Sequence, residues 1–257
     1  MIVLAVDRLH DIYETQLKGQ KIVLISGSAN TDSYGIPVYQ KLKKLAGKEL
    51  RAIWSLQHGF FVDKQDNMIF SEPFYWEDLD IEVRSLYGES LLPESDWIDG
   101  IDMIVVDIFD IGTRVYTFVN HILKLMRFYS GHSVKFLVLD RPNPLGGKVC
   151  EGNVAEASHF SIVGEMAVPM RHGMTAGEFL AHGKYLEQLD IDIDIIPVQG
   201  WGRELFEPLW TYPSPNMPTY RTAIVYPGAV MLEGTDLSVG RGTTRPFEFV
   251  GAPYIDG

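Results

Sequence analysis

Residues 103–108 read Met-Ile-Val-Val-Asp-Ile, an apolar run interrupted by a single aspartate near its end. Its length and its β-branched side chains predict a buried strand. Apolar periodicity predicts a helix over 115–128, and 134–139 is a second apolar run that ends at Asp140. A strand, a helix and a second strand in this order predict a βαβ unit, in which the two strands are parallel.

The same alternation extends outward in both directions. Toward the N-terminus we expect strands over 21–26 and 50–56, with a helix between them that begins near Pro37 and ends before Gly47. Toward the C-terminus, Thr175 and Glu178 have the spacing of a capping box, which predicts the start of a helix that runs to about residue 189. Strands are expected over 191–198 and 225–232, and an irregular excursion over 61–97.

This pattern predicts a Rossmann-like α/β fold: a doubly wound, mainly parallel sheet with helices on both faces and long loops at the strand ends. No linker or internal repeat divides the chain, so residues 1–257 are predicted to form a single domain. The content of 46% hydrophobic and 22% charged residues is ordinary for a globular protein.

Charge and cysteine usage exclude several classes of function. The net charge of −12 argues against a nucleic-acid partner, because phosphate binding needs a basic surface. Cys150 is the sole cysteine, so neither an intrachain disulfide nor a cysteine metal cluster is expected. Residues 1–8 lack a signal-peptide pattern and no apolar run approaches the ~18 residues of a membrane span, so we expect a cytoplasmic protein without a membrane span. The sequence does not predict an oligomeric state.

Polar residues follow three of the predicted strands. In a parallel sheet, ligands bind outside the carboxyl ends of the strands, and these residues are therefore candidates for a site. The alternative is that each acid merely caps a helix or forms a turn. The candidates at the strand ends are Gln57 and His58 after the strand at 50–56, Asp107 and Asp110 at the end of the strand at 103–108, and Asp140, Arg141 and Asn143 after 134–139.

Other candidates lie in polar loops farther along the chain. Arginines suit carboxylate recognition, and asparagine amides suit sugar hydroxyl or acetamido groups. A nucleotide site is the weaker alternative, because no Gly-x-Gly-x-x-Gly follows the first strand and the glycine-rich segment 232–245 lacks the lysine of a P-loop. Metal-ligand spacing such as His-Glu-x-x-His is also missing. The candidates here are Arg114, Tyr116, Arg171, His172, Asn216, Glu233, Arg241 and Arg245.

Taken in order, these segments resemble a known family. They are Gln-His-Gly-Phe at 57–60, Asp-Ile-Gly-Thr-Arg-Val-Tyr-Thr at 110–117, Asp-Arg-Pro-Asn-Pro at 140–144, Arg-His-Gly-Met-Thr at 171–175, Pro-Ser-Pro-Asn-Met-Pro at 213–218 and Leu-Glu-Gly-Thr at 232–235. The series is similar to that of the exo-β-N-acetylmuramidases, long called domain of unknown function 1343. The resemblance implies a Rossmann-like domain without a metal or nucleotide cofactor. It also implies that the substrate is a small muramyl sugar: terminal N-acetylmuramic acid would be removed from peptidoglycan fragments.

The resemblance also implies catalytic roles for individual residues and shows where this chain departs from the family. A glycosidic bond needs an acid for the leaving oxygen and a second group that supports the oxocarbenium-like transition state. The resemblance implies Glu233, Asp107, Asp110 or Asp140 for these roles, supported by His58 and Tyr116. The family has a glutamate where this chain has Gln57, and its smaller C-terminal domain is expected to be missing. Two predictions stay open. The chain is either a hydrolase that is weakened or inactivated by Gln57, or a non-catalytic module that binds muramyl sugars or has a regulatory role.

Overall fold

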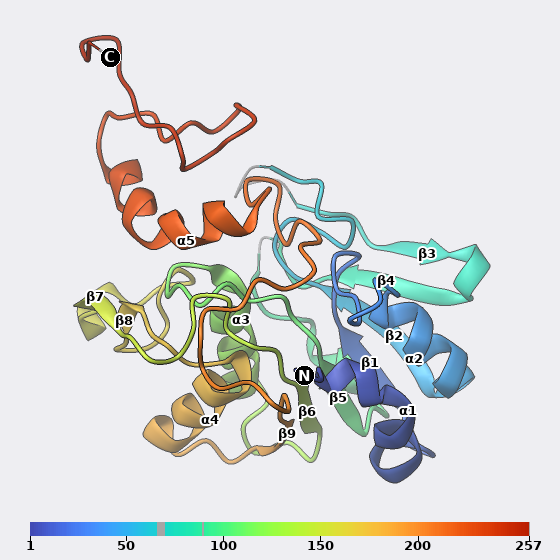
Figure 1. The fold of residues 1–257 in the computed structure, drawn as a ribbon. Helices are drawn as coiled ribbons and strands as arrows, with labels where there is room; N and C mark the ends of the chain where they lie inside the picture. The colour runs from blue at the N-terminus through green and yellow to red at the C-terminus, as the bar shows by residue number, and fades with distance from the viewer. Residues whose placement is uncertain (66–69, 89, 257) are drawn as a thin grey trace.

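The computed structural model describes residues 1–65, 70–88 and 90–256. Its centre is a seven-stranded sheet in the order β3-β4-β2-β1-β5-β6-β9, in which only β3 runs antiparallel to its neighbour (Figure 1). The strands are β1 (Ile22–Ile25), β2 (Leu50–Ser55), β3 (Phe74–Trp76), β4 (Ile81–Ser85), β5 (Met103–Val106), β6 (Lys135–Leu139) and β9 (Asp192–Ile196). The six parallel strands have the 3-2-1-4-5-6 order of a Rossmann fold, as predicted.

Helices cover both faces of the sheet, because successive strand side chains point to opposite faces. In β1, Ile22 and Leu24 pack toward α1 (Leu9–Ile12) and α2 (Val38–Ala46), whereas Val23 and Ile25 pack toward α3 (Thr117–Phe128) and α4 (Ala176–Glu187). Figure 1 shows the two helix pairs on opposite sides of the sheet. The buried strands are apolar on both faces, which is why they appear as continuous hydrophobic runs in the sequence.

Two predictions of secondary structure were wrong. The excursion 61–97 contains β3 and β4; in β4, buried Ile81 and Val83 alternate with the charged Glu82 and Arg84. The strand expected at 225–232 is instead the helix α5 (Tyr220–Ala229), followed by the 3-10 helix η7 (Val230–Gly234). The Thr219 side chain accepts a hydrogen bond from the Thr222 amide and caps α5, so its apolar residues adopt helical spacing.

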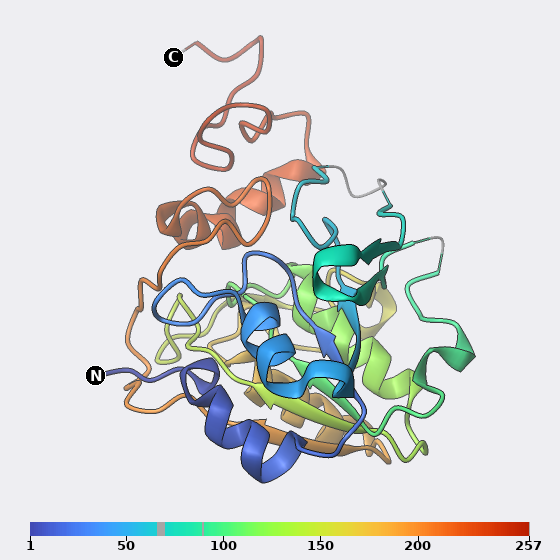
Figure 2. The same cartoon turned by 90° about the vertical axis from the view of Figure 1, so that its right-hand side faces the viewer.

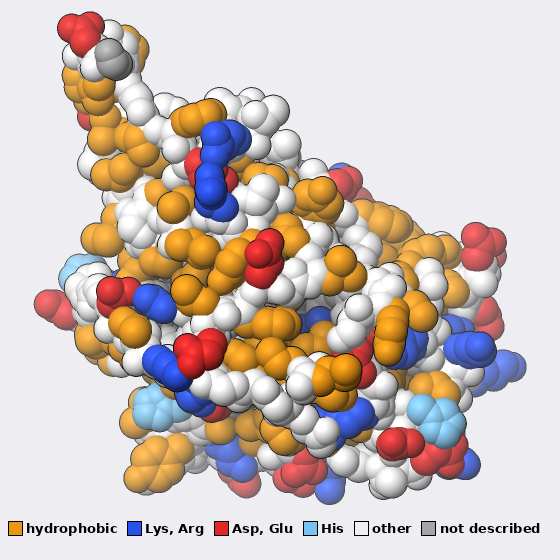
Figure 3. Space-filling model, in the orientation of Figure 1, with side chains coloured by type: hydrophobic (Ala, Val, Ile, Leu, Met, Phe, Trp, Pro, Cys, Tyr) orange, Lys and Arg blue, Asp and Glu red, His pale blue; other side chains and the backbone are white. Residues whose placement is uncertain are grey.

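The C-terminal segment rests above the carboxyl edge of the sheet (Figures 1 and 2). It begins with α5 and η7 and continues as an irregular chain. Elsewhere in the molecule, a hairpin of β7 (Glu151–Val154) and β8 (Pro169–Arg171) lies outside the main sheet. In Figure 3, hydrophobic side chains gather between this segment and the rest of the molecule. Within the described residues, no helix is long and apolar enough to cross a membrane.

Candidate active site

A cavity of about 330 Å³ lies between the carboxyl edge of the sheet and the C-terminal segment. One wall comes from the residues that follow β2 and from the start of α3. The opposite wall comes from α5, η7 and the chain that follows them. The polar or ionisable residues of the lining are Gln57, His58, Tyr87, Tyr116, Thr117, Ser214, Asn216, Tyr226, Glu233 and Arg241. The fold therefore brings together six of the predicted site residues: Gln57, His58, Tyr116, Asn216, Glu233 and Arg241.

Gln57 and His58 form the part of the wall that leaves β2. Gln57 is 6% exposed, and its Oε1 accepts a hydrogen bond from the Thr117 hydroxyl at the start of α3. His58 has a φ of 75°, a left-handed conformation that turns the chain sharply after the strand. Its Nδ1 lies 2.6 Å from the Lys64 carbonyl oxygen. Since a carbonyl can only accept, we assign the proton to Nδ1, which leaves Nε2 as an acceptor.

Electrostatics keep His58 neutral. Burial lowers the pKa of this imidazole, the Lys64 carbonyl opposes that effect, and the nearby Arg241 guanidinium lowers the pKa further. Within the described residues, Nε2 of this neutral imidazole has no hydrogen-bond partner, so it can accept a proton or a hydrogen bond from a ligand in the cavity.

Glu233 is the only carboxylate among the described residues that line the cavity. It belongs to η7, and its Oε1 accepts a hydrogen bond from Nε of Arg241. The Arg241 guanidinium in turn lies 5.0 Å from the centroid of the Phe247 ring. The Glu233 and Arg241 side chains are 33% and 39% exposed, so a ligand can reach both.

Tyr116 and Asn216 provide neutral polar groups to the cavity. Burial raises the pKa of Tyr116 well above its ordinary value, so its phenol stays protonated. Its ring packs edge-on against Tyr226, with the centroids 6.4 Å apart. Asn216 is 9% exposed and lies in the proline-rich loop before α5. The Asn216 amide can form hydrogen bonds with sugar hydroxyl or amide groups, whereas the Tyr116 hydroxyl is inaccessible to solvent.

Asp107 and Arg141 form an ion pair outside the cavity lining. Asp107 is completely buried, and its Oδ1 lies 2.7 Å from Nε of Arg141. Arg141 also donates to Oδ2 of Asp107 and to the Thr31 carbonyl. The pair thus joins the ends of β5 and β6, the role expected of a structural ion pair.

Asp110 lies next along the chain and also outside the lining. Its Oδ1 accepts from the Gly112 amide at 2.7 Å, while Oδ2 is inaccessible to solvent and has no hydrogen-bond partner within the described residues. Burial raises the pKa of this carboxyl group to about 7.

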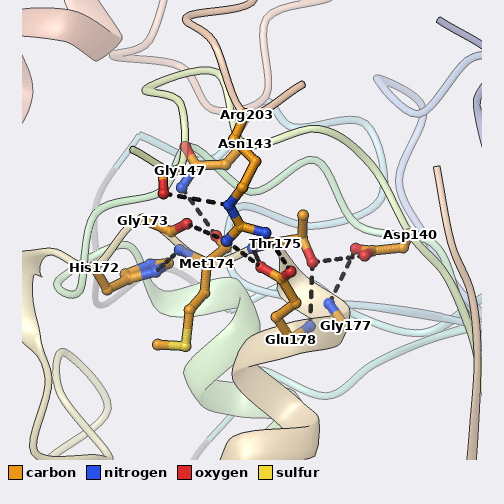
Figure 4. Close-up of polar contacts among 10 residues, drawn as sticks. All are labelled: Asp140, Asn143, Gly147, His172, Gly173, Met174, Thr175, Gly177, Glu178 and Arg203. Carbon is orange, nitrogen blue, oxygen red and sulfur yellow. Dashed lines mark hydrogen bonds and ion pairs between the residues drawn. The ribbon is translucent and has the colours of Figure 1, made fainter. Parts of the chain in front are cut away.

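Asp140, Asn143 and His172 belong to a polar network around the start of α4 (Figure 4). Asp140 accepts from the Thr175 hydroxyl at 2.6 Å and from the Gly177 amide at 3.0 Å, and burial raises its pKa to about 6. Asn143 donates to the Met174 carbonyl, and Nδ1 of His172 accepts from the Met174 amide. Thr175 and Glu178 form the predicted capping box. We call this set, with Gly147, Gly173 and Arg203, the α4 network.

The three remaining arginines have partners elsewhere. Arg114 donates to the carbonyls of Asn153 and Val168, Arg171 pairs with Glu151, and Arg245 pairs with Glu248. None of the three lines the cavity. Their role as substrate ligands therefore stays a prediction without support from the cavity lining.

Several lining residues were missed by the sequence analysis. Thr117 directly follows Tyr116, which was a predicted site residue, so its place in the sequence could have indicated that it lines the site. Tyr226 lies in the segment that was expected to be a strand but is the helix α5, so the sequence did not predict where its side chain points. Tyr87 lies beyond β4, and Phe247 in the irregular chain after η7. Among the described residues, no group of three or more His, Cys, Asp or Glu side chains is placed to hold a metal ion.

Comparison with known proteins decides the family. Residues 22–221 match the family model described as exo-beta-N-acetylmuramidase NamZ, N-terminal, and residues 224–257 match the C-terminal model of the same protein. The chain belongs to the exo-β-N-acetylmuramidase NamZ family. The limit between the two matches falls within α5, so the division of residues 1–257 into domains stays a prediction.

Members of the NamZ family agree with this chain in sequence and in fold. The chain is 35% identical over 254 residues to peptidoglycan beta-N-acetylmuramidase NamZ of Bacillus subtilis, and spans 61% of its length. Two crystal structures of DUF1343 family proteins from Bacteroides fragilis superpose with TM-scores of 0.86 and 0.84 at 28% and 27% identity. These matches cover 99% and 100% of this chain, and 66% and 69% of the two solved chains.

Proposed function

We propose that this chain contains the glycosidase site of an exo-β-N-acetylmuramidase, which releases terminal N-acetylmuramic acid from peptidoglycan fragments. One observation carries the proposal. Glu233 is the sole carboxylate among the described lining residues of a cavity at the carboxyl edge of the sheet, and polar side chains from both walls line the same cavity. Membership of the NamZ family supports the choice of substrate.

Two lining residues fit the groups that distinguish N-acetylmuramic acid from other sugars. Its lactyl group carries a carboxylate, and Arg241 is the only arginine or lysine among the described residues of the lining. Its acetamido group has one donor and one acceptor, which the Asn216 amide can match. We therefore assign Arg241 to the lactyl carboxylate and Asn216 to the acetamido group.

Hydrolysis breaks the bond between the anomeric carbon and the leaving oxygen, adds the oxygen of water to the carbon and delivers a proton to the leaving oxygen. Glu233 carries the negative charge that supports the oxocarbenium-like transition state. The His58 Nε2 is available to take a proton from the attacking water. Gln57 holds the wall position of the family's glutamate, but its amide cannot release a proton. The leaving oxygen therefore takes its proton from a water molecule, and the hydroxide so formed is neutralised by the proton that His58 has accepted. We therefore expect a slow enzyme, since losing a general acid costs on the order of 10²–10⁴ in rate.

Release of the chromophore from a chromogenic N-acetylmuramide tests the proposal. We expect turnover by the chain and none by Glu233→Gln, which keeps the shape of the side chain but removes its charge. The matched control is Glu204→Gln, since Glu204 is an exposed glutamate paired with Lys148 outside the cavity. Turnover by the unaltered chain no faster than by Glu233→Gln would refute the assignment.

A second candidate function is a non-catalytic module that keeps the muramyl pocket. Gln57 specifically favours it, because its Oε1 is already engaged by the Thr117 hydroxyl and the residue has no proton to transfer. This candidate predicts saturable binding of N-acetylmuramic acid without turnover. Calorimetric titration of the chain with this sugar distinguishes the two functions.

A further inference from the structure

Part of the active-site cavity is lined by an apolar turn that has no role in the proposed mechanism. Ile162 and Val163 line the cavity, and they lie in the loop of residues 155–168 that joins β7 to β8. Val163 is 45% exposed, so it borders both the cavity and the solvent and lies at the rim. Ile162 is half-buried beside it. We call these two residues the rim turn.

The rim turn is a tight reversal of the chain. Ser161 and Gly164 exchange both backbone hydrogen bonds, at 3.1 and 2.8 Å, so Ile162 and Val163 are its two central residues. Both central residues have a negative φ, which fits a type I turn. Serine before the central pair and glycine after it are ordinary in such a turn. Isoleucine and valine are not, because branched side chains favour strands.

Burial in the core does not explain the choice of these two residues. Within the described chain, neither Ile162 nor Val163 belongs to the two hydrophobic clusters of the core or packs against them. Residues that contradict the local structural preference are expected at functional sites. The rim turn therefore presents an apolar surface to the cavity at a place where the local preference is for polar residues.

Contacts with α3 and with the residues before it hold the hairpin in place. The Arg114 guanidinium donates to the carbonyls of Asn153 and Val168, at 2.6 and 2.8 Å, and so joins the two arms of the hairpin. Directly after the turn, the Glu165 amide donates to Oδ1 of Asn120 in α3 at 3.0 Å. The start of α3 also forms part of the cavity wall, so the turn and the wall share one support. A contact that is preorganised in this way loses little conformational freedom on binding.

We infer that the rim turn forms an apolar contact for the leaving group of the substrate and so determines which leaving groups the site prefers. The inference rests on the proposed function: in an exo-acting enzyme the terminal sugar enters the cavity, and the leaving group stays at the rim. A pyranose with equatorial hydroxyl groups carries axial C–H groups on its faces, and an aromatic ring is apolar on both faces. Either can pack on Ile162 and Val163 and remove apolar surface from water.

The test measures the affinity of the full chain for methyl and phenyl 1-thio-N-acetylmuramides by calorimetry. Sulfur replaces the leaving oxygen and slows hydrolysis, and the two compounds differ only in the leaving group. We expect the phenyl compound to bind about tenfold more tightly, because its ring covers apolar surface. The double variant Ile162→Ser/Val163→Asn keeps residues that suit a turn. In this variant the ratio should fall to about twofold or less, while the affinity for the methyl compound stays unchanged.

Three further variants separate the contact from a fold defect. Ile162→Val keeps the apolar surface and should keep the ratio. Val154→Asn is the matched control, since Val154 is a 52% exposed valine of the same hairpin outside the cavity lining, and it should leave both affinities unchanged. Melting curves report the fold of the double variant, and Val163→Asn alone repeats the test with a change confined to the half-exposed side chain.

The outcomes distinguish the inference from the proposed function on which it rests. An unchanged ratio in the folded turn variants would overturn the inference. An equal loss of affinity for both compounds would overturn it too, because the turn would then contact the terminal sugar. In both cases the proposed function would stand. Failure of the unaltered chain to bind either compound would refute the proposed function and the inference together.

Discussion

Two groups of polar residues lie near the carboxyl edge of this sheet, and their bonding differs. In the α4 network, Asp140, Asn143 and Thr175 use their polar atoms on one another and on backbone groups (Figure 4). Around the cavity, His58 keeps an acceptor nitrogen and the Glu233–Arg241 pair stays partly exposed. The first arrangement stabilises the junction of β6 and α4, and the second leaves capacity for a ligand.

The two arginine–carboxylate pairs give the same contrast. The side chains of Arg141 and Asp107 are 12% and 0% exposed, whereas those of Arg241 and Glu233 are 39% and 33% exposed. Breaking a buried pair leaves an uncompensated charge in a medium of low polarity, but breaking an exposed pair leaves a hydrated one. The consequences of mutation should therefore differ in kind.

The largest expected effect is that of Arg141→Ala on stability. It leaves the buried Asp107 carboxylate without its cation, which should lower the free energy of unfolding by about 3–5 kcal/mol. Urea unfolding followed by tryptophan fluorescence measures the change. Lys148→Ala is the control, since the ion pair between Lys148 and Glu204 is more than half exposed on both sides. A loss below about 1 kcal/mol, the value for an exposed pair, would contradict the structural role.

Asp110→Asn should stabilise the protein at alkaline pH. Burial raises the pKa of Asp110 in the folded state to about 7, above the unfolded value of about 3.9. The folded state therefore holds this proton more tightly, and its contribution to stability is lost as pH rises from about 4 to 7. Asparagine resembles the protonated form and should add roughly 2–4 kcal/mol above pH 7 and little at pH 4. Melting curves across pH 4–8 measure this; parallel curves for both proteins would contradict it.

The smallest expected stability effect is that of Arg241→Ala. The loss of its exposed pair with Glu233 should lower the free energy of unfolding by less than about 1 kcal/mol. Its affinity for N-acetylmuramic acid should fall about tenfold, because the lactyl carboxylate loses its cation. Calorimetry and urea unfolding measure the two effects separately. Unchanged affinity would remove Arg241 from the proposed substrate contacts.

The contrast also explains what the sequence could predict. Residues 103–106 and 134–139 are apolar on both faces, so the parallel strands and the Rossmann-like order followed from the pattern. β4 escaped prediction because its exposed side chains are charged, and α5 because Ile224 and Val225 favour strands while the Thr219 cap favours a helix. In both segments, packing against residues distant in the sequence determined the secondary structure.

The candidate site was predicted only in part, for a related reason. Asp107 and Glu233 are both acids beside polar neighbours in the sequence, and nothing local tells which one is buried against an arginine. The structure buries Asp107 and places Glu233 in the cavity, because the chain after α5 folds back over the edge of the sheet. Tyr226 reaches the cavity from α5 itself.

The central claim is that this cavity performs glycoside hydrolysis and that Gln57 limits its rate. The most direct test compares chromophore release from a chromogenic N-acetylmuramide by the chain and by Gln57→Glu at equal concentration. We predict a gain of about 10²–10⁴ for Gln57→Glu, which Glu233→Gln abolishes when the two are combined. Equal rates for the chain and Gln57→Glu would contradict the claim.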